Sequence, residues 1–314
     1  LRALLTDGQG GGASDDEEGI VNLGRLGIFV SGTVNVGDRD DSDNQRGFDF
    51  ETSGLTLGAD YRLQPGLVFG GAVTYLNSDN DFNSDRGDLE LEGWGVNAYG
   101  IYYLTEQSYL DGTVGYSWFD YDQRRNVRYQ LDGQRVDQRF DADYDGNHLA
   151  LDVGAGYEFA RDGFVLEPVV RLSYVDLEID GFRERARNSG SGSGWAAAID
   201  DQDIESLTLS LGFRASYIIS QSWAIIQPQL DIDWLHEFKD DTRLLTGRFA
   251  EAANTSANRF ELSADQPDAN YFRLGVGASL LFPNGATGFI QYSTILGYDN
   301  LSDHTVNAGL RWEF

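Results

Sequence analysis

Carboxylates are the residues of this sequence best suited to chemistry, because cysteine is absent and the three histidines stand far apart, at positions 148, 236 and 304. A chain without cysteine has no disulfide, no thiolate metal ligand and no thiol nucleophile, and three scattered histidines are too few for a zinc site. Glu184 and Glu237 could act as an acid–base pair only within reach of each other in a perturbed environment, and the sequence indicates neither. In the segment GSGSG, Gly192 stands where a nucleophile elbow requires serine. The sequence therefore predicts no catalytic residue and no enzyme in this stretch.

Four residues around position 80 have the spacing of a calcium loop. Asp79, Asp81, Asn83 and Glu90 occupy its first, third, fifth and twelfth positions, but Ser84 stands at the sixth position, where that loop requires glycine. No helices flank the stretch, as the motif demands. The better interpretation is a solvated acidic surface that collects divalent cations loosely near lipopolysaccharide, so we expect no bound metal and no cofactor.

The elements that must position these side chains are strands. Apolar and polar residues alternate with a period of two in several stretches, as in residues 149–159, 207–217 and 272–282. With boundaries good to about two to four residues, we predict twelve antiparallel strands, at 27–38, 48–62, 66–77, 89–104, 107–122, 146–160, 163–180, 203–219, 222–239, 269–282, 286–298 and 303–314.

The connections between these strands alternate in length. RLQPG, LTEQS, ARDG, ISQS and FPNGA are short and follow even-numbered strands, whereas GDRDDSDNQRG, NSDNDFNSDRGD and residues 123–145, 181–202 and 240–268 are long and follow odd-numbered strands. Barrels of the bacterial outer membrane have short turns at one end and long loops at the other. A soluble Greek-key sandwich has no reason to follow that rule.

The charge and hydropathy of the chain exclude two classes of protein. A formal net charge of −28 repels phosphate backbones, so no nucleic-acid partner is expected. No run of about 18 apolar residues encodes a transmembrane helix, but alternating strands escape such a search. The last residues show this alternation, since Val306, Ala308, Leu310, Trp312 and Phe314 share one face of an extended strand.

The polar faces of the predicted strands carry charges. Their position decides whether the apolar faces point into the barrel or outward to lipid. Twelve apolar faces turned inward would need a very large hydrophobic filling, whereas apolar faces turned outward give a belt against lipid and a wet lumen, with no free strand edge in hydrocarbon. Charges in such a lumen either pair with one another or hold a segment that passes through it. The residues expected to line the lumen are Asp60, Asp152, Glu167, Arg171, Arg214, Asp231, Asp233, Arg273, Arg311 and Glu313.

Several stretches resemble one family in its strand order. FETSGLTLGADYRLQPGLVFGGAVTYLNSDNDF resembles the second and third strands of the autotransporter β-domain, and YLDGTVGYSWFDYD, FVLEPVVRLSYV, SLTLSLGFRASY, IIQPQLDIDWLHEF and VNAGLRWEF resemble later ones. The resemblance implies a translocator barrel in the outer membrane of a Gram-negative bacterium, which anchors and helps export an N-terminal passenger. It also implies that Leu310, Trp312 and Phe314 form the signal read by the barrel assembly machinery, with periplasmic chaperones as further partners.

The N-terminal residues depart from the family pattern. Leu1, Leu4 and Leu5 could end a helix that crosses the lumen, but DGQGGGASDDEEG cannot extend it. No Asn–Asn pair occurs, so the self-cleavage of some family members is not transferred to this chain. We expect a leader over residues 1–25 and one twelve-stranded transmembrane β-barrel over residues 26–314. The alternatives are a stand-alone outer-membrane channel or surface adhesin of the same fold, a secreted soluble β-protein, and an outer-membrane enzyme.

Overall fold

The computed structural model describes residues 25–314, which form an all-β structure, and the leader expected at residues 1–25 lies outside this part except for Arg25. Within it, no helix has the length and apolar content to span a membrane. Twelve long strands form the wall: β1 (Leu26–Arg39), β2 (Phe48–Gln64), β3 (Leu67–Phe82), β4 (Gly87–Tyr103), β5 (Ser108–Leu131), β6 (Gln134–Tyr157), β8 (Phe164–Ile179), β12 (Gln202–Tyr217), β14 (Ile225–Glu237), β17 (Asn270–Leu281), β18 (Ala286–Leu296) and β19 (Leu301–Glu313).

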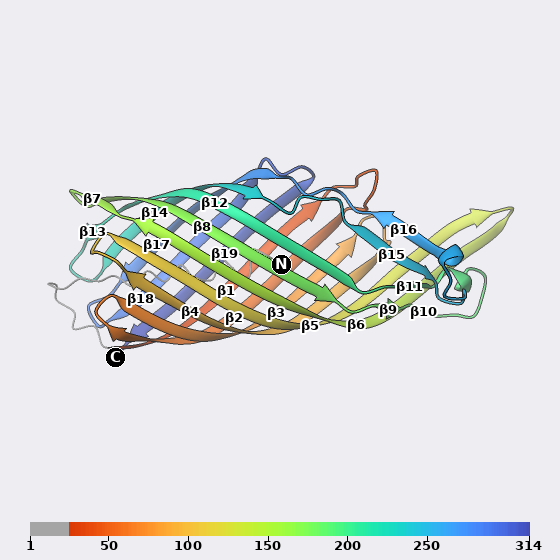
Figure 1. The fold of residues 1–314 in the computed structure, drawn as a ribbon, viewed down its shortest axis with the longest axis horizontal. Coiled ribbons are helices and arrows are strands. Elements are labelled where there is room, and N and C mark those ends of the chain that lie inside the picture. The colour runs from red at the N-terminus through yellow and green to blue at the C-terminus, as the bar shows by residue number, and fades with distance from the viewer. Residues whose placement is uncertain (1–24) are drawn as a thin grey trace.

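These strands form a closed antiparallel ring in chain order (Figure 1). The ring closes where β19 pairs with β1, from Gly27 opposite Glu313 to Arg39 opposite Leu301. Phe314 N–H donates to the Leu26 carbonyl at 2.9 Å, so the pairing continues to the last residue. A closed ring leaves the wall without a free edge. The twelve-stranded antiparallel barrel predicted from the sequence is therefore confirmed.

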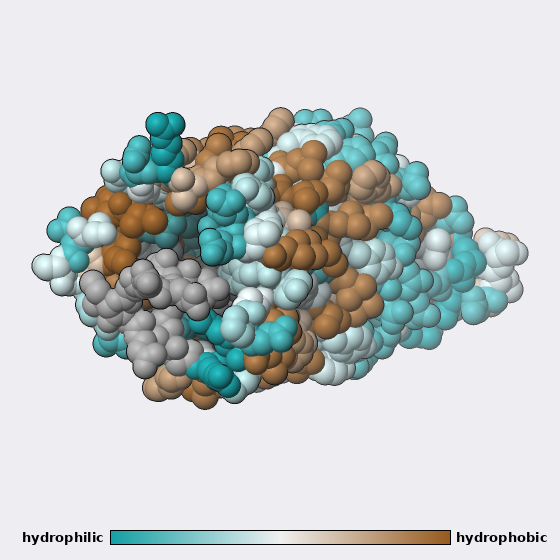
Figure 2. Space-filling model, turned by 60° about the vertical axis from the view of Figure 1, so that its left-hand side comes forward, coloured by the Kyte–Doolittle hydropathy of each residue, from teal (hydrophilic) through white to brown (hydrophobic). Residues whose placement is uncertain are grey.

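The two faces of the wall differ in polarity as the sequence predicted. In β19, Thr305 and Asn307 are 0% and 3% exposed, whereas Val306 and Leu310 are 41% and 47% exposed. Figure 2 shows apolar side chains gathered on the outside of the barrel and mostly hydrophilic ones on its projecting end. The apolar stripes therefore face outward, and the polar stripes face the lumen.

Two connections that the sequence marked as long loops are extensions of the wall. Residues 123–145 continue β5 and β6 into a projecting hairpin, called here the arm, whose turn residues Asp132 and Gly133 have φ of 47° and 80°. NSDNDFNSDRGD likewise continues β3 and β4 up to a turn at Ser84 and Asp85. The prediction of loops was wrong there because Asp- and Asn-rich segments have low strand propensity, which the unbroken ladders overcome.

The two longest outer connections also contain ordered structure. They contribute a second sheet, called here the crown sheet, in the order β16 (Arg259–Ser263), β15 (Leu244–Phe249), β11 (Ala197–Ile199) and β9 (Phe182–Arg183). The short strand β10 (Arg185–Ala186) pairs with β6 in the arm, and η2 (Ser193–Trp195) and η3 (Ser256–Asn258) are single 3₁₀ turns. At the other end of the barrel, the short turns are flanked by β7 (Phe159–Arg161) and β13 (Ile219–Ser220).

Candidate functional site: the lumen and its outer mouth

Polar contacts line the inner wall of the barrel, beginning at the strand pair that closes it. Arg311 Nη2 donates to Asp60 Oδ1 at 2.5 Å, and Arg311 Nη1 lies 2.7 Å from Glu313 Oε1. The hydroxyl of Tyr99 donates to the other oxygen of Asp60 at 3.2 Å. All three charged side chains are less than a fifth exposed. Because an unpaired charge would be costly at such burial, each charge compensates the next.

The same arrangement continues on the opposite wall. Arg171 Nη2 lies 2.6 Å from Asp111 Oδ1. Arg214 lies between two carboxylates, 3.5 Å from Glu167 and 3.6 Å from Asp231. These contacts and those of Arg311 and Asp60 are called the polar girdle.

The other expected lumenal residues also lie on the inner face. Asp152 accepts a hydrogen bond from Ser173 Oγ at 2.5 Å. Asp233 accepts one from Ser210 Oγ at 3.2 Å and is opposite Arg273 in the register of β14 and β17. The inner face therefore carries all ten residues that the alternation placed there.

Four residues of the girdle were not predicted from the sequence. Asp111 is the partner of Arg171, the Tyr99 and Tyr109 hydroxyls donate to carboxylates, and Gln291 Nε2 donates to Asp231 at 3.1 Å. Asp111 stands at an inward position of its alternating strand, so the alternation alone could have identified it. The tyrosines could not be found in this way, because aromatic residues suit both faces of the wall.

Glycines make room for the links of the girdle. Arg311 in β19 and Asp60 in β2 are separated by β1, and a Cβ on Gly27 would lie 2.3 Å from Arg311 Nη2 and 2.8 Å from Asp60 Oδ1. Gly154 of β6 lies in the same way between Asp111 and Arg171, where a Cβ would lie 2.4 Å from Asp111 Oδ2 and 2.9 Å from Arg171 Nη2. Each of these links therefore joins strands that are two apart, across a glycine of the strand between them.

Toward the outer mouth the polarity of the two faces reverses. On the outward face of β5, Val114, Tyr116 and Trp118 give way to Asp120 and Asp122. On the inward face, Phe119 and Tyr121 are buried with Leu76 and Leu91 in an apolar cluster. The outward positions of the neighbouring strands beyond this level are acidic: Asp79, Asp81, Asp88, Glu90, Glu92, Asp143, Asp145, Asp176 and Glu178. This reversal was not predicted from the sequence. The adjacent residues Trp118 and Phe119 mark it, because two neighbouring apolar residues shift the alternation by one position.

The calcium-loop spacing falls on this acidic surface. Asp79 and Glu90 are opposite each other in β3 and β4, and Asp81 is opposite Asp88. A hairpin of paired strands cannot wrap around one ion as a calcium loop does. Among residues 25–314, no group of three or more His, Asp or Glu side chains is placed to hold a metal ion.

The carboxylates considered for acid–base work have structural partners. Glu184 is buried and accepts two hydrogen bonds of 2.6 Å from Arg125, whose guanidinium lies 4.7 Å from the centre of the Phe140 ring. Glu237 accepts from Leu207 N–H and Thr208 Oγ1, both at 2.8 Å. The structure does not join these two carboxylates in one site, since Glu184 binds Arg125 of the arm and Glu237 binds the wall strand β12.

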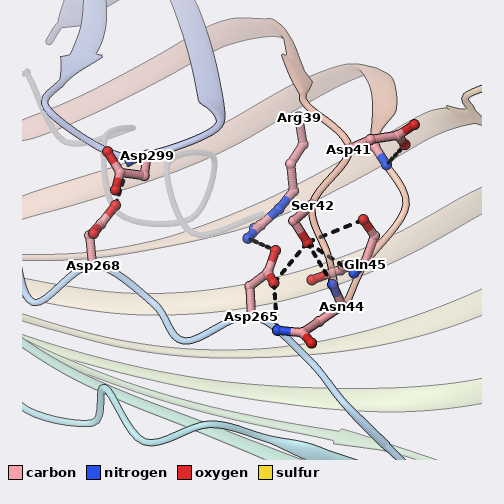
Figure 3. Close-up of polar contacts among 9 residues, drawn as sticks. Arg39, Asp41, Ser42, Asn44, Gln45, Asp265, Asp268 and Asp299 are labelled. Carbon is pink, nitrogen blue, oxygen red and sulfur yellow. Dashed lines mark hydrogen bonds and ion pairs between the residues drawn. The ribbon is translucent and has the colours of Figure 1, made fainter.

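A polar clamp holds the longest outer connection across the rim of the mouth (Figure 3). Asp265 accepts hydrogen bonds from Arg39 Nη2 at 3.3 Å, Ser42 Oγ at 2.8 Å and Asn44 Nδ2 at 3.3 Å. The hydrogen bond from Ser42, followed by those from Arg39 and Asn44 and by the charge of Arg39, holds the pKa of the Asp265 carboxyl below its ordinary value. The clamp joins the connection between β14 and β17 to the one between β1 and β2, three strands away in the ring.

A closed barrel with an apolar exterior, a charged lumen and ordered loops at one end defines the class of outer-membrane β-barrels. The model of the family described as autotransporter β-domain matches residues 28–293, so the chain belongs to that family. This places the barrel in the outer membrane of a Gram-negative bacterium, as the resemblance implied.

Solved barrels share the fold. The translocator domain of autotransporter NalP from Neisseria meningitidis superposes with a TM-score of 0.70 at 17% identity, over 95% of this chain and 90% of that one. The β-domain of the Bordetella autotransporter BrkA gives a TM-score of 0.64 at 22% identity, over 92% of this chain and 100% of that one.

Curated relatives match this chain over only part of their own length. Esterase EstA of Pseudomonas aeruginosa is 25% identical over 84% of this chain, which is 39% of EstA. An extracellular serine protease of Serratia marcescens is 27% identical over 87% of this chain, which is 24% of that protein.

Proposed function

We propose that this barrel anchors an N-terminal passenger and helps to export it through the outer membrane to the cell surface. Residues 1–25 act as the leader that joins the passenger to β1. The polar girdle carries this proposal, because a charged inner face gives a polypeptide in transit polar partners while the closed wall keeps that polypeptide apart from lipid. In this role the ten lumenal residues named from the sequence hold the transiting segment by switching hydrogen bonds from one another to it.

The outer face supplies the other partners. Leu310, Trp312 and Phe314 lie exposed on one face of β19 and its end, where they suit contact with lipid and recognition by the barrel assembly machinery after chaperone-assisted transit of the periplasm. The acidic outward residues above the apolar belt are at the level where lipopolysaccharide head groups would lie. Aromatic pairs such as Tyr75–Trp94, with ring centres 5.0 Å apart, suit the boundary between belt and head groups.

The barrel itself does no catalysis in this proposal. EstA is named an esterase and the Serratia protein a serine protease, and this chain matches the smaller part of each. We infer that such activities belong to the parts of those proteins outside the match.

Surface display of a tagged segment tests the proposal. The barrel is expressed in a Gram-negative host with a signal peptide and an epitope-tagged segment in front of Leu1. We expect external protease to remove the tag from intact cells. The control carries serine at Leu310, Trp312 and Phe314 and should lose both barrel assembly and display.

A tag that stays protected from protease while the barrel is assembled, as judged by heat-modifiable gel mobility, would contradict the proposal. If deletion of residues 1–24 then raised single-channel conductance without any displayed segment, a stand-alone channel would replace it.

A further inference from the structure

The outward side of the arm is rich in arginine. Arg128 of β5 and Arg135 and Arg139 of β6 are at outward positions, because side chains alternate along a strand and Phe140 is buried on the other side. Beyond Asp143, no outward residue of β5 or β6 in the arm is apolar. This part of the outward face therefore differs both from the apolar belt and from the acidic surface that separates the two.

The edge of β6 adds two more arginines to this surface. Arg185 of β10 is opposite Asp141, and Arg187 N–H donates to the Arg139 carbonyl at 2.9 Å. The surface, called here the arginine face, consists of Arg128, Arg135, Asp137, Arg139, Asp141, Arg185 and Arg187. Its charge is positive, although the chain as a whole has a formal net charge of −28.

The guanidinium groups of the arginine face are open to solvent. The side chains of Arg135 and Arg185 are 75% and 76% exposed, and their ion pairs with Asp137 and Asp143 measure 3.1 Å and 3.5 Å. Exposed pairs of this kind are weak, because water screens them. The side chain of Arg187 makes no hydrogen bond or ion pair with any residue that the structure describes. Since a guanidinium has five N–H donors, each of these groups can bind a further anion.

The position of the arginine face limits what can reach it. The arm continues the wall strands beyond the barrel (Figure 1), so its outward side has the direction of the lipid-facing side of the wall. Trp118 is the last apolar outward residue of β5, and Arg128 follows ten residues later, about 25 Å along the barrel axis at the usual rise and tilt of such strands. Asp120 and Asp122 come between them. A ligand of the arginine face must therefore carry its negative charge well beyond the edge of the apolar belt.

We propose that the arginine face binds the sugar part of lipopolysaccharide in the outer leaflet around the barrel, through the phosphate and carboxylate groups that these sugars carry. The family match places the barrel in that membrane. The contact fixes the arm against the sugar layer, and it requires neither a passenger nor a chain in transit.

The chemistry of the face selects this ligand. Guanidinium groups bind phosphate and carboxylate through two parallel hydrogen bonds. Neighbouring side chains on one face of an antiparallel pair are about 5–8 Å apart, so several arginines can bind successive charges of one oligosaccharide. A glycerophospholipid carries its charge at the edge of the apolar belt, where the acidic residues lie. A protein partner would need apolar anchors, which this face lacks.

Binding of a lipid-free sugar tests the proposal. The chain is placed in phospholipid nanodiscs and titrated with the deacylated carbohydrate of a rough lipopolysaccharide, so that acyl chains contribute nothing. Arg135→Gln, Arg185→Gln and Arg187→Gln are combined in one variant. We expect its dissociation constant to be about tenfold higher than that of the parent, because three exposed charge contacts are lost. Enzymatic removal of phosphate from the sugar should also weaken its binding to the parent.

A second triple variant is the matched control. It combines Arg46→Gln, Arg161→Gln and Arg183→Gln, which change the net charge equally at side chains that are 64%, 90% and 54% exposed elsewhere on the molecule. We expect its dissociation constant to differ from that of the parent by less than about twofold. Heat-modifiable gel mobility checks that both variants remain folded.

Crosslinking in the outer membrane identifies the ligand. A benzophenone amino acid replaces Gln130, which is exposed and opposite Arg135 on the outward side of the arm. We expect a crosslinked product that reacts with antibody against lipopolysaccharide. Its yield should fall about tenfold in the triple variant of the arginine face and stay unchanged in the control variant.

Equal dissociation constants for the two triple variants would overturn the proposal. Binding of heparin, a soluble polyanion, without binding of the lipopolysaccharide sugar would overturn it in favour of an anionic ligand from outside the cell. Crosslinks from position 130 to a protein and not to lipopolysaccharide would overturn it in favour of a protein partner. Each of these outcomes leaves the export function standing, since display of a tagged segment measures that function separately.

Discussion

The wall of the barrel and the arm are built from the same two strands, β5 and β6, yet they are apolar on opposite sides. In the wall, the outward residues Val114, Tyr116 and Trp118 are exposed and apolar. In the arm, Phe140 is buried on the inward side among residues of the outer connections. Pairing is continuous through both regions, so the surrounding medium, and not the ladder, decides which face is apolar. A bilayer around the wall and water around the arm produce this difference.

The largest expected effect comes from removing a buried charge in the wall. Arg311→Met leaves Asp60 and Glu313 without their cation, and we expect it to lower the free energy of unfolding by about 3–5 kcal/mol. The control is Arg183→Met in the crown sheet, whose pair with Glu251 is exposed and should contribute at most about 1 kcal/mol. Urea titration in detergent, followed by heat-modifiable gel mobility, measures both. Equal losses would show that the lumen is too wet for the girdle to matter.

Loss of an apolar side chain should act on the arm without unfolding the wall. Phe140→Ala empties the site that packs against Ala196 and Ala250, and a cost of about 3 kcal/mol is expected for a buried phenylalanine. Because this cost is local, trypsin should cut residues 181–202 while gel mobility stays native. The control Phe272→Ala, on the exposed outer face, should leave these residues resistant. If Phe140→Ala unfolded the entire barrel, arm and wall would be one cooperative unit.

Opposite ends of the outward face of β5 should respond differently to the same charge. Val114→Arg puts a cation into the apolar belt, at a cost of about 2–4 kcal/mol near the middle of a bilayer. Asp122→Arg lies beyond the polarity reversal and should change stability by less than about 0.5 kcal/mol. Folding into vesicles, titrated with urea, measures the difference. A similar cost for both would mean that the belt extends past Trp118.

The smallest effect concerns the clamp on the outer mouth. The folded-state pKa of Asp265 is lowered, so its stabilisation is present above the unfolded pKa of about 3.9 and is lost as pH falls through the lower folded value. Since the chain has no cysteine, a single spin label at Ala264→Cys can report the mobility of the connection. We expect the spectrum to sharpen upon acidification, and at neutral pH in Asp265→Asn. The control Asp43→Asn changes a carboxylate outside the clamp and should leave the spectrum unchanged. If the Asp265→Asn spectrum equalled that of the parent, the clamp would not restrain this connection.

The sequence predicted the wall better than its outer end, for an identifiable reason. Alternation located all twelve wall strands and the inward position of residues such as Asp60 and Arg311. It failed at 123–145, where charged residues resembled a loop, and at 181–202 and 240–268, where the short strands of the crown sheet carry little local signal. Strands of two to six residues are stabilised by partners distant in sequence, and a local pattern does not specify those partners.

The sequence by itself determined which residues share a face, because side-chain direction in a strand repeats every two residues and needs no tertiary information. Only the tertiary structure decided which inward residues meet. Arg311 reaches Asp60 because the ring closes β19 onto β1 and Gly27 leaves space between them. The partner of each lumenal charge therefore depends on register and closure, which are properties of the assembled barrel and of no single strand.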